Sequence, residues 1–263
     1  MSQNQNSSPT LKPLRFDQAL PLFAVPAIVM FISYHALIPA LTWIGLSELE
    51  AYLVAHILPM ALLFTASVVA YGQVEKNPLR FKAFKERFRL NKNTFKTIAI
   101  GVGVFILANL GYGLFNQAAV LLIQKGIISL HVYVPALADP MIGFTTDSLS
   151  QMLGGPIAGR WDIVVVWVVM LFFNVVGEEL WWRGYILPRQ ELAHGNWTWL
   201  VHGLLWCAFH TFKWWDLIGL LPVCLILSFF VQKTKNTTVG LVVHFLFNGM
   251  ALVLLIGSVI RVI

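Results

Sequence analysis

Long apolar runs constrain this chain more strongly than any other feature of its sequence. Runs of about 20 apolar residues recur along its 263 residues, and a helix of that length crosses the hydrocarbon core of a bilayer. Hydrophobic residues make up 58% of the chain and charged residues 11%, whereas a soluble domain carries about 25% charged residues. A soluble protein is therefore excluded, and we expect an all-α, polytopic bundle of transmembrane helices.

The apolar runs predict about seven transmembrane spans, with eight as the alternative. The fifth and sixth runs are short, so these two segments could tilt or re-enter the membrane. Residues 1–19 are polar and are expected to form a cytoplasmic tail, residues 20–155 an N-terminal region of spans, and residues 156–263 a second transmembrane region. The predicted spans lie at residues 20–44, 50–72, 97–124, 161–187, 198–214, 216–232 and 238–260.

Basic side chains are concentrated in one segment between the second and third predicted spans. Segment 75–96 holds eight of the 18 Lys and Arg residues, interleaved with Phe and Leu, which is typical of an amphipathic juxtamembrane segment that lies against anionic lipid. This pattern favours the lipid bilayer over nucleic acid as the partner. In the predicted topology most Lys and Arg residues outside the spans lie on the same side of the membrane as the N-terminus. This bias predicts that the N-terminus is cytoplasmic and that the membrane is the cell (inner) membrane. The eight residues are Lys76, Arg80, Lys82, Lys85, Arg87, Arg89, Lys92 and Lys96.

Polar side chains interrupt three of the apolar runs in the second region. Each charged group at the centre of a membrane helix costs roughly 2.5–3.5 kcal/mol on insertion scales. Two adjacent glutamates are therefore expected to face the bundle interior or a hydrated cavity, and such residues are candidates for function. The polar residues are Asn174, Glu178, Glu179 and Arg183 in the fourth span, His210 in the fifth, and His244 and Asn248 in the seventh.

Helical spacing separates the two glutamates. Glu179 and Arg183 are four residues apart and share one stripe of the helix, which predicts an intrahelical ion pair. Glu178 points about 100° away and aligns with Asn174. A structural clamp is the simpler interpretation of the ion pair, and a carboxyl group bonded to Asn174 or to a histidine is the structural interpretation of Glu178. Two histidines on separate helices, together with a glutamate outside the ion pair, favour a functional site.

The other histidines and the tryptophans show no comparable pattern. His35, His56 and His202 are isolated in their predicted spans, with no carboxylate partner visible in the sequence. The ten tryptophans, Trp181 and Trp182 among them, cluster near the ends of predicted spans, which is typical of the aromatic belt at a membrane interface. We therefore assign none of these residues to the site.

The polar residues of the second region resemble the motifs of a known family. Three motifs carry the resemblance: Glu178-Glu179-x-x-x-Arg183, an aromatic residue followed by x-x-x-His ending at His210, and His244-x-x-x-Asn248. Together they resemble the CAAX protease and bacteriocin-processing family, known as CPBP or Abi, which includes the type II CAAX prenyl endopeptidases. The resemblance covers roughly residues 160–255. The second motif of the family usually begins with Phe and here begins with Trp206, so we expect altered packing rather than lost chemistry.

The resemblance implies an intramembrane glutamic endopeptidase that works without a metal or another cofactor. In such an enzyme Glu178 together with His210 would activate the attacking water. His244 and Asn248 would stabilise the oxyanion of the tetrahedral intermediate.

The resemblance also implies how the remainder of the second region serves this chemistry. Glu179 and Arg183 would support the site, and residues 156–263 would form the catalytic core. Peptide hydrolysis needs water, so a conical cavity in this core would be hydrated. The water would enter from the cytoplasmic side, because the Glu178 end of its predicted span lies there. The substrate would be a membrane-associated protein or peptide.

Two other functions remain open at this point. A glutamate with two histidines is also a catalytic zinc set, which would make the chain a zinc-dependent membrane protease, although it has no His-Glu-x-x-His motif. A buried ionisable cluster is equally compatible with a non-catalytic scaffold, immunity or transport protein in the membrane.

Overall fold

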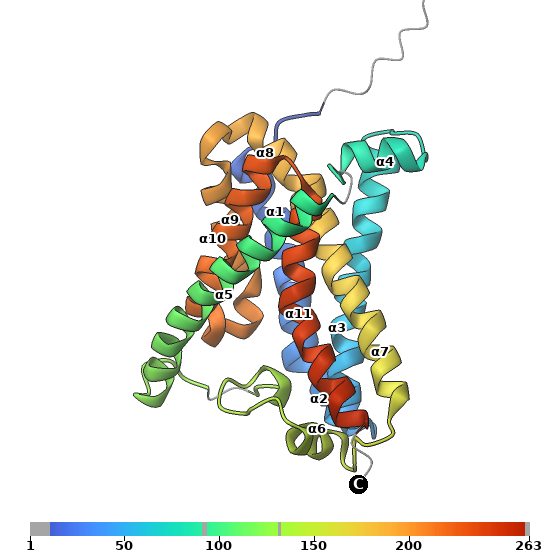
Figure 1. Ribbon diagram of the computed structural model, residues 1–263, viewed down its shortest axis with the longest axis vertical. Helices are drawn as coiled ribbons and strands as arrows, with labels where there is room; N and C mark the ends of the chain where they lie inside the picture. The colour runs from blue at the N-terminus through green and yellow to red at the C-terminus, as the bar shows by residue number, and fades with distance from the viewer. Residues whose placement is uncertain (1–10, 91–93, 131–132, 261–263) are drawn as a thin grey trace, which may run out of the picture.

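The computed structural model describes residues 11–90, 94–130 and 133–260 and confirms the predicted all-α fold (Figure 1). Within these ranges the chain forms helices and connecting segments, and no strand. Five continuous helical segments of the described chain are long and apolar enough to cross a membrane: Phe16–Trp43, Glu48–Val74, Phe95–Gln124, Trp161–Thr234 and Thr237–Ile260.

The N-terminal region follows the predicted spans closely. Ser47 and Glu50 form a capping box that fixes the start of α3, and Thr94 caps α5. The first helix begins at Phe16, inside the predicted tail 1–19, whose first ten residues lie outside the described ranges. The elements are α1 (Phe16–Ile32), η1 (Ser33–Leu37), α2 (Ile38–Trp43), α3 (Glu48–Val69), η2 (Ala70–Val74), α4 (Phe81–Arg87) and α5 (Phe95–Gln124).

The N-terminal region ends with two short connecting helices, η3 (Ala136–Ala138) and α6 (Thr146–Leu153), before the second region begins. The segment Trp161–Thr234 that follows is not one straight rod, because α7, α9 and α10 occupy separate positions in the bundle (Figure 1). The three spans predicted there coincide approximately with these helices, while the total of about seven spans stays a prediction. The elements are α7 (Trp161–Phe172), η4 (Phe173–Gly177), η5 (Leu180–Ile186), α8 (Leu187–His194), η6 (Gly195–Trp197), α9 (Thr198–Phe209), η7 (His210–Asp216), α10 (Leu217–Thr234) and α11 (Thr237–Ile260).

The adjacent glutamates lie between two π-helical segments. Here η4 ends at Gly177 and η5 begins at Leu180. In a π-helix each turn holds more residues than an α-turn, and such turns occur frequently at functional sites. The helix is therefore irregular on both sides of Glu178 and Glu179.

The two regions approach each other closely beside this irregular helix. A Cβ atom on Gly177 would stand 2.6 Å from the backbone oxygen of Met60 in α3, so only glycine permits this approach without displacement. Phe23 of α1 stacks on Trp182 of η5, with ring centroids 4.4 Å apart and 9° between the planes. These contacts place α1 and α3 against the helix that carries the glutamates.

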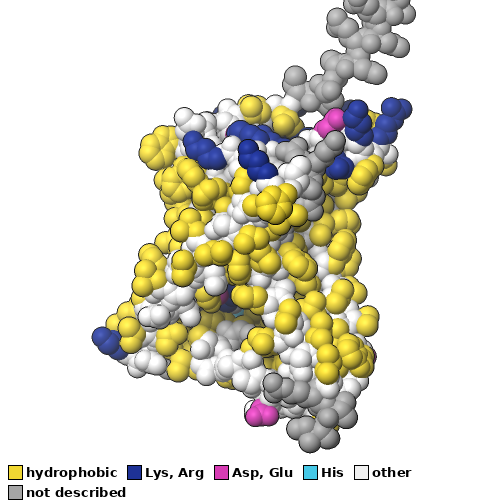
Figure 2. Space-filling view, viewed as in Figure 1, with side chains coloured by type: hydrophobic (Ala, Val, Ile, Leu, Met, Phe, Trp, Pro, Cys, Tyr) yellow, Lys and Arg dark blue, Asp and Glu magenta, His cyan; other side chains and the backbone are white. Residues whose placement is uncertain are grey.

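In the described part of the basic segment 75–96, α4 is the one helix that lies wholly within it, and some of its basic side chains form ion pairs inside the protein. Arg87 pairs with Glu75 at 2.6 Å and donates to the backbone oxygen of Gly184 at 2.8 Å. Arg89 pairs with Glu191 at 2.8 Å. Lys and Arg side chains gather at the end of the molecule that carries α4 and α8 (Figure 2). Lys92, which belongs to the predicted segment, lies outside the described residues.

Candidate functional site

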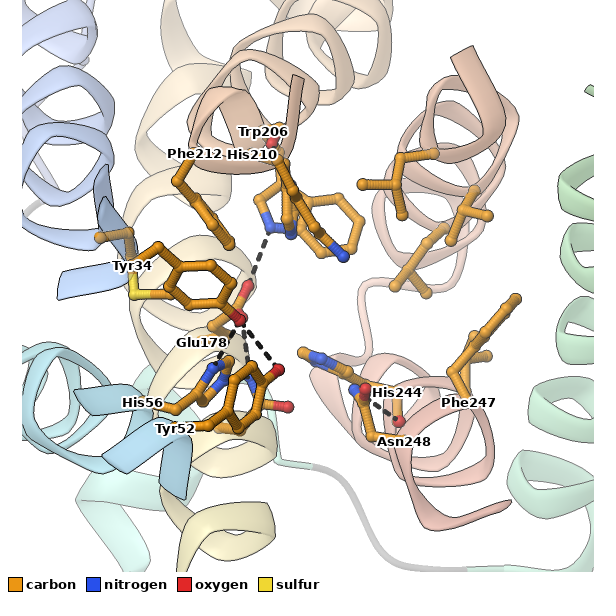
Figure 3. Close-up of a pocket in the computed structure, with 17 residues that line it drawn as sticks. Tyr34, Tyr52, His56, Glu178, Trp206, His210, Phe212, His244, Phe247 and Asn248 are labelled. Carbon is orange, nitrogen blue, oxygen red and sulfur yellow. Dashed lines mark hydrogen bonds between the residues drawn. The ribbon is translucent and has the colours of Figure 1, made fainter. Parts of the chain in front are cut away.

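A cavity of about 150 Å³ lies inside the bundle and collects the predicted site residues (Figure 3). The four residues that the resemblance marks as catalytic, Glu178, His210, His244 and Asn248, all line it. They come from three separate stretches of the second region. The N-terminal region closes the opposite wall with residues Met30, Tyr34, Tyr52 and His56.

The Glu178 carboxylate accepts three hydrogen bonds from N–H donors. Asn174 donates to Oε1 at 3.1 Å, while the indole nitrogens of Trp182 and Trp206 donate to Oε2 at 3.1 and 3.0 Å. An indole N–H can only donate, and each carboxylate oxygen has two acceptor positions. Oε2 is thus fully engaged, and Oε1 keeps one position free beside the cavity.

Glu179 points away from the cavity, as its spacing from Glu178 predicted. Its Oε1 lies 3.0 Å from an Arg183 nitrogen, an ion pair whose angle falls outside hydrogen-bond geometry. The Arg183 guanidinium also lies over the Trp206 ring, 3.4 Å from its centroid, which is a cation–π contact. Both charged side chains are fully buried. The predicted intrahelical ion pair is therefore present.

His210 is held in a defined tautomer. Its Nδ1 lies 2.8 Å from the backbone oxygen of Trp206, and because a carbonyl oxygen only accepts, Nδ1 must carry the proton. In the neutral ring Nε2 is then the basic nitrogen. Among the described contacts no hydrogen bond joins His210 to Glu178, so the two side chains line the same cavity without being hydrogen-bonded to each other.

His244 is linked to the buried ion pair rather than to Glu178. Its Nδ1 donates to Glu179 Oε1 at 3.1 Å, so Glu179 orients the imidazole ring from behind. Asn248 lies four residues later and also lines the cavity, and its Nδ2 lies 3.5 Å from the backbone oxygen of His244. The predicted polar face of α11 is thus turned towards the cavity.

Trp182 and His56 contact the predicted site residues, although neither was predicted to belong to the site. Trp182 was placed in an aromatic belt, but its side chain is fully buried and bonds Glu178. Its spacing of four residues from Glu178 is a signal that could have revealed this contact. His56 contacts Asn174 at 3.3 Å, and nothing in the sequence marks a partner so distant along the chain.

Trp206 does more than alter packing. Its indole nitrogen bonds Glu178, its ring contacts Arg183, and its backbone oxygen fixes His210. A phenylalanine at this position could provide the last two contacts but not the first.

A second, polar cavity adjoins the first and extends towards the end of the molecule that lies opposite the basic side chains. This second cavity of about 370 Å³ shares Tyr34, Tyr52 and Lys213 with the first and is bounded by residues 137–140 of the connecting segment between α5 and α6. Figure 2 shows this face hollowed in its lower half, opposite the end where the basic side chains gather. The expectation of water access from the cytoplasmic, basic side is therefore not supported by the shape of the protein.

The donor set does not form an evident metal centre. Within the described chain no group of three or more His, Cys, Asp or Glu side chains is arranged to hold a metal ion. The Glu178 carboxylate is instead surrounded by N–H donors, which compete with a cation for its oxygen atoms.

The fold and the cavity together define a polytopic helical membrane protein with a buried carboxylate and two histidines at one site. Comparison with protein families then places it more narrowly: residues 160–250 match the family described as Type II CAAX prenyl endopeptidase Rce1-like. The match confirms the resemblance to the CPBP family over this segment and implies a membrane protease of CAAX type. No curated protein and no solved structure matches the chain.

Proposed function

We propose that the protein is an intramembrane endopeptidase that hydrolyses a peptide bond of a membrane-associated protein or peptide, with Glu178 and His210 activating the water. The observation that carries the proposal is the shared cavity, into which Glu178 brings a carboxylate oxygen with a free acceptor position and His210 a basic ring nitrogen. A general base takes a proton from water when it lies within hydrogen-bond reach of it.

The reaction follows from these two groups. A water molecule that donates to Glu178 Oε1 and His210 Nε2 attacks the carbonyl carbon of the scissile bond, and its proton passes to one of these bases. The tetrahedral intermediate then collapses, the carbon–nitrogen bond breaks, and the proton moves to the leaving amine. The products are a carboxylic acid and an amine, and the enzyme returns to its starting state.

The oxyanion is stabilised from the opposite wall. Asn248 offers amide N–H donors, and the His244 ring, held through Nδ1 by the Glu179 carboxylate at 3.1 Å, donates from Nε2 in its doubly protonated form. Removal of one such donor typically costs about a hundredfold to a thousandfold in rate. The second, polar cavity supplies the route by which water reaches these groups.

A non-catalytic role is the second candidate, and one observation favours it. Glu178 is buried and accepts three hydrogen bonds, which is how a structural carboxylate in a bundle is satisfied. A scaffold, immunity or transport protein would need no free acceptor position on Oε1 and no fixed tautomer of His210.

The decisive experiment compares Glu178→Gln with the wild-type protein in lipid nanodiscs, using a quenched fluorescent CAAX peptide with a farnesylated cysteine as the probe. We expect Glu178→Gln to lower kcat/KM by roughly a hundredfold to ten-thousandfold, because glutamine cannot take the proton. The matched control is Glu86→Gln on the exposed surface of α4, which should cleave as the wild type does.

Two further measurements separate the alternatives. Cleavage that stops on treatment with a chelator and returns on addition of zinc would favour a zinc-dependent protease. In cells, comparison of the membrane proteome of the wild type and Glu178→Gln should reveal precursors that accumulate uncut. If Glu178→Gln is present at normal levels, leaves no precursor and cleaves the probe at the wild-type rate, the protein is not a glutamic protease.

A further inference from the structure

A chain of hydrogen bonds connects the N-terminal helices to the candidate base. Tyr52 and Tyr34 join through their hydroxyls at 2.9 Å, and the Tyr34 hydroxyl lies 3.0 Å from His56 Nδ1. On the other side of the ring, His56 Nε2 lies 3.3 Å from Asn174 Nδ2, which also donates to Glu178 Oε1 at 3.1 Å. The chain spans η1, α3 and η4 and forms one wall of the cavity (Figure 3).

The direction of each link follows from the amide of Asn174. If this amide were turned round, its oxygen would face the Glu178 carboxylate, and two acceptors would stand in contact. Nδ2 therefore faces Glu178, and because it carries only donors, His56 Nε2 must accept. His56 Nδ1 then carries the ring proton and donates to Tyr34, whose own O–H donates to Tyr52.

The oxygen at the end of this chain is the one that the proposed reaction uses. Oε2 of Glu178 is occupied by two indole donors, whereas Oε1 has Asn174 as its one described donor. The position of Oε1 relative to the attacking water thus depends on Asn174. Asn174 in turn is held from two sides, by Glu178 and by His56.

We infer that His56 is a positioning residue for Glu178, acting through Asn174. The inference rests on the proposed function and deepens it, because it assigns part of the active-site geometry to α3, outside the segment 160–250 that matches the protease family. Without an acceptor at the place of Nε2, the Asn174 amide loses one of its two anchors. Oε1 then samples orientations in which it cannot receive the proton of the attacking water, and kcat falls while substrate binding is unchanged.

The test uses three replacements of His56 that differ in the atom they keep. Glutamine can place an oxygen near the former Nε2 and accept from Asn174, whereas asparagine can replace only the contact to Tyr34, and leucine keeps neither. We expect His56→Asn and His56→Leu to lower kcat for the farnesylated probe about tenfold or more with unchanged KM, and His56→Gln to recover most of it. His194→Gln, in α8 and away from the cavity, is the control for histidine loss.

A double-mutant cycle shows whether the effect passes through Asn174. If it does, Asn174→Ala and the double variant His56→Leu/Asn174→Ala share the same kcat, because the second change removes nothing further. If His56 were merely structural, all three His56 variants would have a lower unfolding midpoint. The effects of His56→Leu and Asn174→Ala on kcat would then add in the double variant. Wild-type kcat in His56→Leu, or equal losses in His56→Gln and His56→Leu, would overturn the inference.

An infrared measurement needs no substrate and keeps the inference separate from the proposed function. The carboxylate stretching band that disappears in Glu178→Gln is assigned to Glu178, and it should shift in His56→Leu and keep its wild-type position in His56→Gln. A band unmoved in His56→Leu contradicts the positioning role whatever the protein cleaves. If the band shifts but the protein cleaves no peptide, the link from His56 through Asn174 to Glu178 is supported and the protease proposal is refuted.

Discussion

The N-terminal region and the second region line the same cavity with different chemistry. Here η1 and α3 contribute neutral hydrogen-bonding groups and α1 contributes the apolar Met30, whereas the charged residues that line the cavity, Glu178 and Lys213, both come from the second region. The ion pair behind the cavity, Glu179 with Arg183, belongs to the second region too. In the proposed mechanism one region therefore carries the reacting groups, and the other orients them and closes the wall.

This difference explains why only one region is recognisable by comparison. The family match spans residues 160–250, where charged and polar groups stand at fixed helical spacing. The wall formed by α1 and α3 needs only the right shape and one acceptor for Asn174, and many apolar sequences can provide these. The matched segment thus covers the part of the cavity that carries the charged groups and leaves out the wall that the N-terminal region forms.

The largest effect should come from Glu179→Gln, which tests whether the charges of the second region hold the site together. The change leaves Arg183 buried without its partner, and breaking a buried pair in this way costs about 3–5 kcal/mol. We expect a strong fall in the midpoint of unfolding in detergent. The double variant Glu179→Gln/Arg183→Met removes the unpaired charge and should recover much of the stability. If Glu179→Gln unfolds at the same midpoint as the wild type, the ion pair does not stabilise the fold.

A smaller effect should come from Gly177→Ala, which loosens the contact between the two regions. The added methyl group meets the backbone oxygen of Met60, so α3 must move, and overpacking of this kind costs about 1–3 kcal/mol. Because the shift also separates His56 from Asn174, cleavage of the farnesylated probe should fall with stability. Gly103→Ala in α5 is the control, since a Cβ there meets nothing within 4 Å. Equal behaviour of the two variants would mean that the close approach is unimportant.

The smallest effect should come from Trp206→Phe, which installs the residue that the family usually has. The phenylalanine keeps the ring beneath Arg183 and the backbone oxygen for His210, and it removes one donor to Glu178 Oε2. A hydrogen bond to a charged group contributes at most about 1.5–3 kcal/mol to stability, and Trp182 still donates to the same oxygen. We therefore expect a small fall in the unfolding midpoint and a fall in kcat of roughly tenfold. Trp199→Phe, whose ring packs against Phe229, is the control. An unchanged or higher kcat would show that this third donor is dispensable.

Much of the fold and part of the site follow from the sequence because they depend on local spacing. Apolar runs of spanning length predict the membrane helices, and a spacing of four residues predicts the contact of Glu178 with Asn174 and that of Glu179 with Arg183. These pairs lie within one helix and therefore need no knowledge of the tertiary structure.

The remaining contacts could not be predicted, because they join residues that are far apart in the chain. The contact of His56 with Asn174 and that of His244 with Glu179 arise only when α3 and α11 pack beside the glutamate helix. Trp182 was missed for another reason: its place near the end of a predicted span suggested a membrane interface, whereas the helix around it is buried on all sides. Position along a span is a poor guide to burial where several helices surround it.

The π-helical segments η4 and η5 bear on how this protein should be aligned with its relatives. A π-turn accommodates one residue more than an α-turn, so a relative that lacks one residue within 173–177 can form an α-turn there and keep the following helix in register. The same loss within α7 would instead rotate that helix by about 100°. Glu179 would then point where Glu178 points now. Gaps of one residue between family members are thus expected inside η4 or η5 rather than in α7, and an alignment that places them elsewhere would pair the wrong glutamates.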